Sequence, residues 1–160
     1  MKSEYYFEHW PQHFDAVLFD LDGVLTATAN IHAICWKRMF DEFLRKRALA
    51  EVTSYNPFDI DADYKKYVDG KLRYDGVRSF LAGRGIKLPE GSADDPPGRD
   101  TICGLGNRKD SMVKEVLETQ GVGVFDGSLK LLEKVREAGL RTAVVSASKN
   151  CETVLKLSLI

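Results

Sequence analysis

The sequence predicts an α/β fold in which a helical module is inserted after the first strand of a parallel-sheet core. Two short apolar runs, residues 16–19 and 142–145, each end abruptly in polar residues, a pattern typical of parallel strands that are covered on both faces. Before the second run, residues 128–138 place apolar side chains on one face of a helix, and Gly139 follows where helices commonly end. A helix, a glycine and an apolar strand in this order indicate an α/β core.

The middle of the chain has helical spacing instead. Apolar residues recur every three or four positions in three stretches, residues 31–44, 77–81 and 112–117. We therefore expect residues 1–30 and 122–160 to form the core and residues 31–121 to form the helical module. Because only two core strands are visible, we expect the sheet in this chain to be incomplete.

The composition disfavours several classes of function, among them nucleic-acid binding and membrane insertion. The chain of 160 residues carries 23 Lys and Arg against 24 Asp and Glu, a formal net charge of −1, which gives no general electrostatic reason to bind nucleic acid or an anionic membrane. No apolar run approaches the roughly 18 residues that cross a bilayer, and the N-terminal residues lack a signal-peptide pattern. The three cysteines are widely spaced (Cys35, Cys103 and Cys151), and we expect them to be reduced thiols of a cytoplasmic protein.

Two carboxylates directly follow the first predicted strand. Asp20 and Asp22 lie where open α/β sheets bind ligands, outside the carboxyl end of a strand, and Gly23 allows a tight turn there. Asp20 ends the rigid strand and is the better placed of the two to attack a phosphoryl group, while Asp22 suits proton transfer with the leaving oxygen. Oxygen ligands at this density also suit Mg²⁺. The alternative, a pair of solvated turn aspartates, is disfavoured by the apolar strand before them.

The second predicted strand ends in hydroxyl side chains. Ser146 suits a hydrogen bond to a phosphoryl oxygen, and Lys149 and Asn150 follow at an expected helix start, where backbone N–H groups favour anions. Serines commonly end strands, so this segment by itself is weak evidence for a phosphate site. The acidic end of the other strand supports that interpretation. Together the two strand ends predict a phosphate site at one edge of the sheet.

Three stretches of sequence resemble a known family. Residues 20–26, Asp-Leu-Asp-Gly-Val-Leu-Thr, resemble the first motif of the haloacid dehalogenase (HAD) superfamily. Residues 144–150, Val-Val-Ser-Ala-Ser-Lys-Asn, resemble its second motif in the form found in β-phosphoglucomutases, and residues 26–36 resemble the same subfamily. The resemblance covers nearly all of the chain from Phe14 onward. It implies a HAD-like Rossmannoid parallel-sheet core, with the inserted helical module as an α-helical cap.

The resemblance implies a role for each residue at the strand ends. Asp20 would be the phosphorylated nucleophile, and Asp22 would be the general acid and base. Mg²⁺ would be held by the Asp20 carboxylate and the Asp22 backbone carbonyl. Phosphate would be bound by Ser146, Ala147 and Lys149, and substrate would be bound by Thr28, His32, Arg73, Lys109, Ser148 and Asn150.

The substrate residues outside the strand ends have competing interpretations. The resemblance places Thr28 and His32 at the hinge into the cap, gives Arg73 the substrate's second phosphate and lets Lys109 face the substrate. A helical histidine such as His32 is also common as a core or surface residue. Arg73 could instead form a surface ion pair beside Asp75, and Lys109 could be one charge in a solvated run.

Two further motifs of the family have no match in this sequence. The family uses a lysine near the nucleophile and an acidic pair that completes the Mg²⁺ site, and no Asp/Glu pair follows Ser146. We therefore expect the chain to be a fragment or a truncated gene product, or to be completed by another polypeptide. The uncovered edge of the first strand would otherwise favour self-association.

The resemblance implies a Mg²⁺-dependent phosphoryl-transfer enzyme of the β-phosphoglucomutase type. Such an enzyme interconverts β-glucose 1-phosphate and glucose 6-phosphate through an aspartyl-phosphate and a bisphosphate. The alternatives are a HAD-type sugar-phosphate phosphatase, with water as the final acceptor, and a catalytically dead truncated remnant. A phosphorylated sugar is the expected partner in the first two cases, and the 160-residue chain alone is expected to be inactive.

Overall fold

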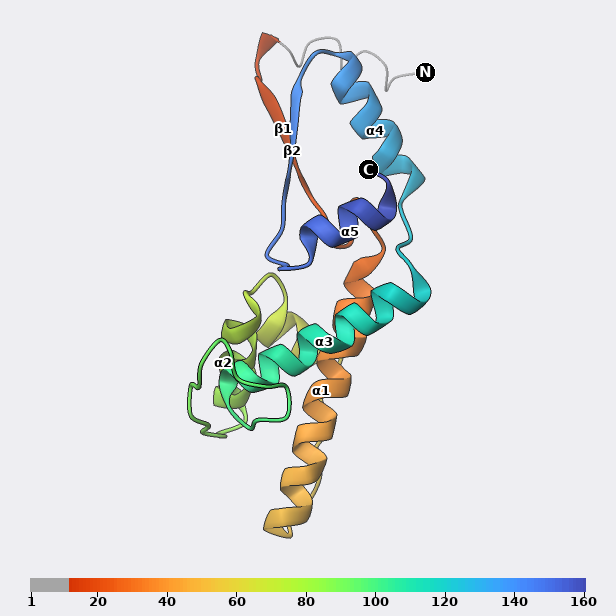
Figure 1. The fold of residues 1–160 in the computed structure, drawn as a ribbon. Helices are drawn as coiled ribbons and strands as arrows, with labels where there is room; N and C mark the ends of the chain where they lie inside the picture. The colour runs from red at the N-terminus through yellow and green to blue at the C-terminus, as the bar shows by residue number, and fades with distance from the viewer. Residues whose placement is uncertain (1–11) are drawn as a thin grey trace. The chain divides into compact units, whose positions relative to one another are not determined.

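The computed structural model describes residues 12–160, which divide into two compact units (Figure 1). The first unit combines the described residues up to Ala29 with Gly121–Ile160, and the second consists of Asn30–Gln120. The first unit contains β1 (Ala16–Asp20), α4 (Asp126–Glu137), β2 (Arg141–Val145) and α5 (Cys151–Ser158). The second contains most of α1 (Thr28–Glu51), then η2 (Tyr64–Val68), α2 (Arg73–Gly83) and α3 (Ile102–Gln120).

A parallel pair of strands organises the first unit. β1 and β2 pair from Ala16 opposite Arg141 to Asp20 opposite Val145, so both strands end at the same level. α4 packs beside β2 and ends at Glu137. Gly139 follows two residues later, has a φ of +79° and donates its N–H to the Arg136 carbonyl at 2.9 Å. A glycine adopts this left-handed conformation without a Cβ clash. The predicted parallel α/β arrangement is therefore confirmed.

The sheet is covered on one face only by the described residues. Phe19 is buried, whereas Leu18 is 66% exposed and Val145 is 58% exposed. Successive side chains of a strand point to opposite faces, and every residue on the Leu18 face of both strands is exposed. The prediction that these apolar runs are covered on both faces is wrong for this structure, because the described helices shield only the Phe19 face.

The chain leaves and re-enters the first unit through two segments that lie side by side. The Ala27 N–H donates to the Gly123 carbonyl at 2.8 Å, and the Phe125 N–H donates to the Leu25 carbonyl at 3.1 Å. The turn before them is closed by Gly23, whose N–H donates to the Thr26 carbonyl at 2.7 Å. These bonds fix the loop that follows β1, which carries the candidate acid and base.

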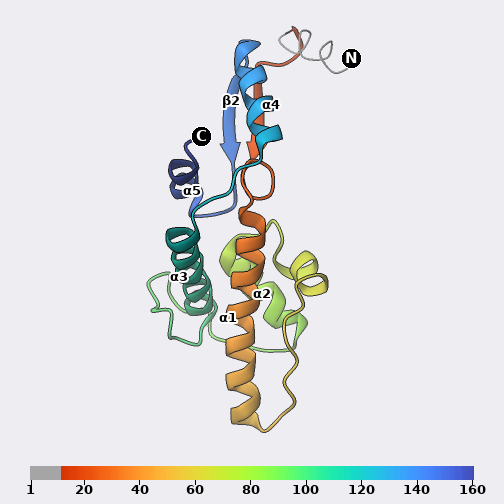
Figure 2. The same cartoon turned by 90° about the vertical axis from the view of Figure 1, so that its right-hand side faces the viewer.

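An aromatic cluster forms the core of the second unit. Phe40 on α1 packs on Trp36, Phe58 and Phe80, with ring centroids 5.3, 5.2 and 4.1 Å away respectively. Figure 2 shows α2 and α3 beside the long helix α1. α1 exceeds the predicted helix at both ends, since it spans Thr28–Glu51 rather than residues 31–44. Within residues 12–160 no helix is both long enough and apolar enough to cross a membrane.

A buried carboxylate ties the loop before α3. Asp95 accepts hydrogen bonds from the Thr101 hydroxyl at 2.7 Å, the Arg99 guanidinium at 2.9 Å and the Ser92 N–H at 3.2 Å. The Thr101 bond is the main cause of a lowered Asp95 pKa, because hydrogen bonds to the charged form stabilise it. Gly104 follows at the start of α3, where a Cβ would lie 2.2 Å from the Arg99 carbonyl oxygen.

Truncating Phe40 should destabilise the second unit. Phe40→Ala removes a fully buried ring from the centre of the aromatic cluster, and such changes cost about 3–5 kcal/mol. Denaturant unfolding followed by helical circular dichroism measures this loss. Leu49→Ala on the same helix is the matched control, because Leu49 is 77% exposed, and it should change the unfolding free energy by less than about 0.5 kcal/mol. Equal effects of the two variants would contradict the assigned core.

Candidate active site

The carboxyl ends of the two strands bring Asp22 and Ser146 together. The Ser146 hydroxyl lies 3.2 Å from Asp22 Oδ2 and donates to it, across 124 positions of sequence. The other oxygen of Asp22, Oδ1, accepts a hydrogen bond from the Thr28 hydroxyl. Asp20 lies exposed at the end of β1, where its Oδ1 accepts the Leu21 N–H at 2.7 Å. The parallel register accounts for this meeting, since it aligns Asp20 with Val145.

Two buried threonine hydroxyls lead to the Asp22 carboxylate: Thr28 contacts Asp22, and Thr26 contacts Thr28. Thr26 and Thr28 are fully buried, and their hydroxyl oxygens lie 2.8 Å apart. Thr28 gives its single proton to Asp22, and the Thr26 hydroxyl, which also has one proton, has two acceptors within reach, Thr28 Oγ1 at 2.8 Å and the Leu21 carbonyl at 3.2 Å. These hydroxyls orient the Asp22 carboxylate. Thr26 belongs to the first motif but was not predicted as a site residue. Its contact with Thr28 depends on the turn that follows β1, and the sequence pattern does not show that contact.

The segment after β2 is ordered by its own hydroxyls. Ser146 Oγ accepts the Ser148 N–H at 3.0 Å, and Ser148 Oγ accepts the Asn150 N–H at 3.2 Å. Asn150 is buried and immediately precedes α5. The structure thus brings Ser146, Ser148 and Asn150 into one turn beside Asp22, while Ala147 and Lys149 on the same turn are exposed.

Cys151 is a site neighbour that the sequence analysis did not identify. It is the first residue of α5 and is partly buried. Burial raises the pKa of its thiol, and the negative charges of Asp22 and Asp20 raise it further. No spacing signal links Cys151 to the acidic strand end, because the fold alone brings α5 to it.

Asp20 and Asp22 offer donor atoms of the type that binds Mg²⁺. The Asp20 carboxylate and the Asp22 backbone carbonyl are hard oxygen ligands of the type that Mg²⁺ prefers. Both carboxylate oxygens of Asp22 accept hydroxyl hydrogen bonds, and the family resemblance assigns the metal contact to its backbone carbonyl. Among residues 12–160 no group of three or more acidic, histidine or cysteine side chains is placed to hold a metal ion. These two donors would therefore supply a minority of the roughly six oxygens that Mg²⁺ takes.

A second group of predicted site residues meets in the second unit. Lys109 Nζ lies 2.7 Å from His32 Nδ1 and 5.1 Å from the centroid of the Trp36 ring. Lys109 is only 6% exposed, which argues against the interpretation that it is one charge in a solvated run. A lysine is rarely buried without a specific use for its charge, so its place beside His32 is consistent with a functional role.

Arg73 lies in the same unit and is held by two partners. Its guanidinium contacts Asp110 Oδ2 at 3.2 Å and donates to the Tyr74 hydroxyl at 2.7 Å. The alternative, a surface ion pair between Arg73 and Asp75, is absent from the described contacts. Asp75 instead pairs with Arg78 at 2.5 Å. The predicted site residues thus form two groups, one in each unit.

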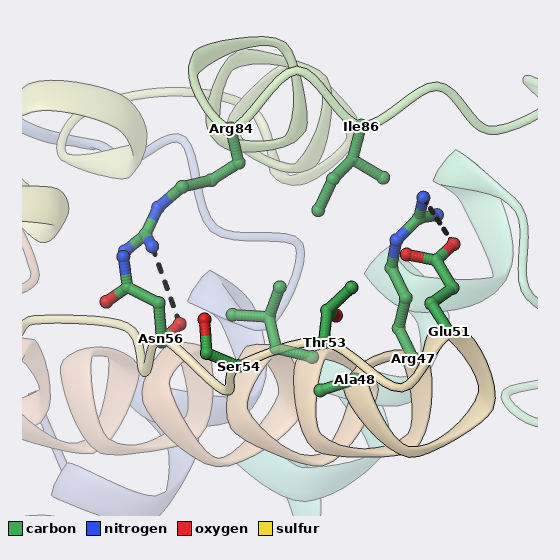
Figure 3. A pocket seen from close by; sticks show the side chains of 9 residues that line it. Arg47, Ala48, Glu51, Thr53, Ser54, Asn56, Arg84 and Ile86 are labelled. Carbon is green, nitrogen blue, oxygen red and sulfur yellow. Dashed lines mark hydrogen bonds and ion pairs between the residues drawn. The ribbon is translucent and has the colours of Figure 1, made fainter.

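A pocket of about 230 Å³ lies elsewhere in the second unit, beside the end of α1 (Figure 3). Its charged side chains have partners, since Arg47 pairs with Glu51 at 2.6 Å and Arg84 donates to the Asn56 carbonyl at 3.4 Å. None of the predicted site residues lines it. We therefore assign it no part in the candidate active site.

Comparison with known proteins agrees with the motifs. A family model for haloacid dehalogenase-like hydrolases matches residues 14–158. The chain belongs to this family. It is 54% identical over 145 residues to a protein of Mycobacterium tuberculosis (strain CDC 1551 / Oshkosh) named beta-phosphoglucomutase, with 91% of this chain and 55% of that protein covered. The chain therefore spans about half the length of the curated relatives it matches.

Solved structures show the same fold. An archaeal beta-phosphoglucomutase from Pyrococcus sp. strain ST 04 superposes with a TM-score of 0.55 at 26% identity, covering 87% of this chain and 55% of that one. A hydrolase from Pseudomonas syringae superposes with a TM-score of 0.62 at 19% identity, covering 92% and 57%. The HAD-like fold and the resemblance to β-phosphoglucomutases predicted from the sequence are thus confirmed.

The raised pKa of Cys151 predicts slow alkylation. A raised pKa lowers the thiolate fraction at a given pH, and the thiolate is the reactive form. Residues 1–160 treated with iodoacetamide at pH 8 should label Cys151 more slowly than a free cysteine peptide, as followed by mass spectrometry of the Cys151 peptide. Asp22→Asn removes one of the two negative charges and should accelerate labelling. Asp94→Asn, an exposed change in the other unit, is the control, and an equal rate in the Asp22 variant would contradict the proximity.

Proposed function

We propose that this chain carries the nucleophile and the acid–base residue of a Mg²⁺-dependent phosphoryl-transfer enzyme of the β-phosphoglucomutase type. The observation that carries the proposal is the hydrogen bond between Asp22 and Ser146 beyond the aligned ends of two parallel strands, the first of which ends in Asp20. A carboxylate nucleophile, a second carboxylate and a hydroxyl at one strand edge suit phosphoryl transfer. The 54% identity to a protein named beta-phosphoglucomutase supports the same activity class.

Asp20 and Asp22 divide the chemistry in this proposal. An oxygen of the Asp20 carboxylate forms a bond to phosphorus while the bond from phosphorus to the leaving oxygen breaks, and Asp22, which enters this step in its protonated form, gives that oxygen its proton. The phosphoryl group then passes from Asp20 to an acceptor hydroxyl, whose proton returns to Asp22. Mg²⁺, held by the Asp20 carboxylate and the Asp22 carbonyl, would offset the repulsion between the carboxylates and the phosphate.

Ser146 has one proton and two candidate acceptors. In the structure it donates to Asp22 Oδ2. When a phosphoryl oxygen is bound at the strand ends, the same hydroxyl would donate to that oxygen instead, because a hydroxyl has a single O–H. Asp22 Oδ2 would then be released for the leaving oxygen, while Thr28 continues to hold Oδ1. Phosphate binding would thus free one oxygen of the acid–base residue.

A mutase differs from a phosphatase in holding two phosphates. Arg73 and Lys109 are two cations of the second unit, and each is fixed by a neighbour, Tyr74 and His32 respectively. A cation that its neighbours hold in place suits the second phosphate of a bisphosphorylated sugar. The runner-up is a HAD-type sugar-phosphate phosphatase, which the shared family and the hydrolases among the structural neighbours support.

An activity test requires the remaining part of the family fold. We define the extended chain as residues 1–160 fused to the residues that follow the matched region in the M. tuberculosis relative. In the extended chain, Asp20→Asn should abolish phosphoryl transfer from β-glucose 1-phosphate, because a neutral amide is a poor nucleophile and a poor Mg²⁺ ligand. Glucose 6-phosphate formation and ³²P labelling of the protein measure the loss. Asp94→Asn is the matched control, and an aspartyl-phosphate in the Asp20 variant would remove Asp20 from this role.

Residues 1–160 should have no appreciable turnover without that extension. Two oxygen donors hold Mg²⁺ weakly, and removing one preorganised charged or hydrogen-bonding group commonly costs about 10²–10³ in rate. The assay compares residues 1–160 with the extended chain at equal concentration, with Mg²⁺ and a glucose 1,6-bisphosphate primer. Product as glucose 6-phosphate indicates a mutase, and inorganic phosphate indicates a phosphatase. Equal turnover by the two proteins would show that the described residues suffice.

A further inference from the structure

We propose that Tyr74 is a positioning residue for Arg73, and that it ties the clamp for the second phosphate to the loop before α3 through Asn107. This inference rests on the proposed function, in which Arg73 binds the second phosphate of the substrate. Tyr74 itself contacts no substrate in this proposal. It acts by holding the guanidinium in one place before the phosphate arrives.

Tyr74 contacts the Arg73 guanidinium in two ways. Arg73 Nη2 donates to the Tyr74 hydroxyl at 2.7 Å, and the guanidinium carbon lies 4.7 Å from the centroid of the Tyr74 ring. The Arg73 side chain is 20% exposed, and its buried Nη1 donates no hydrogen bond within the described residues, so that nitrogen retains N–H donors for an anion. Arginine has a long side chain with many rotamers, so a fixed guanidinium binds phosphate more tightly than a free one.

The hydrogen bonds around Tyr74 run in a single direction. A guanidinium only donates, so the Tyr74 hydroxyl accepts from Arg73 and gives its own proton to Asn107 Oδ1 at 2.9 Å. The Asn107 amide nitrogen then donates to the carbonyls of Ala93 at 2.9 Å and Asp95 at 2.8 Å. If the Asn107 amide were turned round, its oxygen would face the two carbonyl oxygens, so the direction of these bonds follows from the two carbonyls. The position of the Arg73 guanidinium is therefore linked to the loop that Asp95 ties.

A glycine on α3 makes room for this arrangement. A Cβ at Gly106 would lie 2.6 Å from Cδ1 of the Tyr74 ring and 3.6 Å from Cγ of Arg73. Glycine within a helix is less favourable than alanine, so its presence at this position has a packing reason. The Tyr74 ring lies directly against the α3 backbone, which limits its movement.

Asp110 is the other anchor of Arg73, and it differs from Tyr74 in charge. Asp110 Oδ2 lies 3.2 Å from Arg73 Nη1 and 3.1 Å from Lys114 Nζ. A carboxylate holds a guanidinium but also offsets its charge and repels an incoming phosphate. Tyr74 holds the same guanidinium without offsetting its charge. The neutral anchor is thus the one that can stay in place when an anion binds.

A double-mutant cycle in the extended chain tests this role. All variants carry Asp20→Asn, so that bound sugar phosphates do not react, and calorimetry measures the Kd of glucose 1,6-bisphosphate and of inorganic phosphate. Arg73→Ala should weaken bisphosphate binding about 10- to 100-fold relative to inorganic phosphate. Tyr74→Phe keeps the ring against Gly106 and should weaken bisphosphate binding about 10-fold. In the Arg73→Ala background, Tyr74→Phe should have less than about a twofold effect, since its partner is absent.

Two further variants complete the test. Asn107→Ala removes the acceptor of the Tyr74 proton and should weaken bisphosphate binding in the same direction, again only while Arg73 is present. Tyr67→Phe removes a hydroxyl from another tyrosine of the same unit, which packs on Phe80, and should leave both dissociation constants unchanged. Thermal unfolding of each variant verifies the fold.

The outcomes separate this inference from the proposed function. If Arg73→Ala weakens bisphosphate binding but Tyr74→Phe has no effect, the clamp stands and the role of Tyr74 is wrong. The role is equally wrong if Tyr74→Phe has the same effect with and without Arg73. If Arg73→Ala affects the two ligands equally, Arg73 is no second-phosphate clamp, and both the mutase proposal and the role of Tyr74 are overturned.

Discussion

The parallel register of β1 and β2 is the constraint on which the candidate site depends. It aligns Asp20 with Val145, so the residues after each strand, Asp22 and Ser146, leave the sheet at one edge and meet at 3.2 Å. A shift of one residue would turn every side chain of a strand to the opposite face. The buried face of the sheet, with Phe19 at its centre, therefore fixes the register and with it the chemistry.

The donor and acceptor roles of the hydroxyl groups restrict which hydrogen bonds the candidate site residues form. Asp22 accepts from two hydroxyls, Thr28 and Ser146, and the Thr28 hydroxyl lies 2.8 Å from that of Thr26. The Tyr74 hydroxyl in the second unit is fixed by the same reasoning, between a group that only donates and an amide oxygen. In both units a charged functional group is oriented by a neutral hydroxyl, which directs the group without cancelling its charge.

The uncovered face of the sheet agrees with the extent of the match to known proteins. Leu18 and Val145 lie exposed on one face of β1 and β2, whereas parallel sheets are ordinarily covered on both faces. The chain spans 55% of the M. tuberculosis relative. The two carboxylates and the serine proposed for phosphoryl transfer, together with the residues of the second unit, all lie within this half.

The sequence by itself determined the α/β class, the two strands, the acidic strand end and the family, because each of these depends on local periodicity or on a contiguous motif. The roles of the site residues remain predictions that the geometry supports. Only the tertiary structure showed that Thr26 stands behind Thr28, that Cys151 lies near Asp22 and that Tyr74 holds Arg73. These relations join residues through turns and helix packing, where side-chain direction and donor order decide which groups meet, and no spacing in the sequence encodes them.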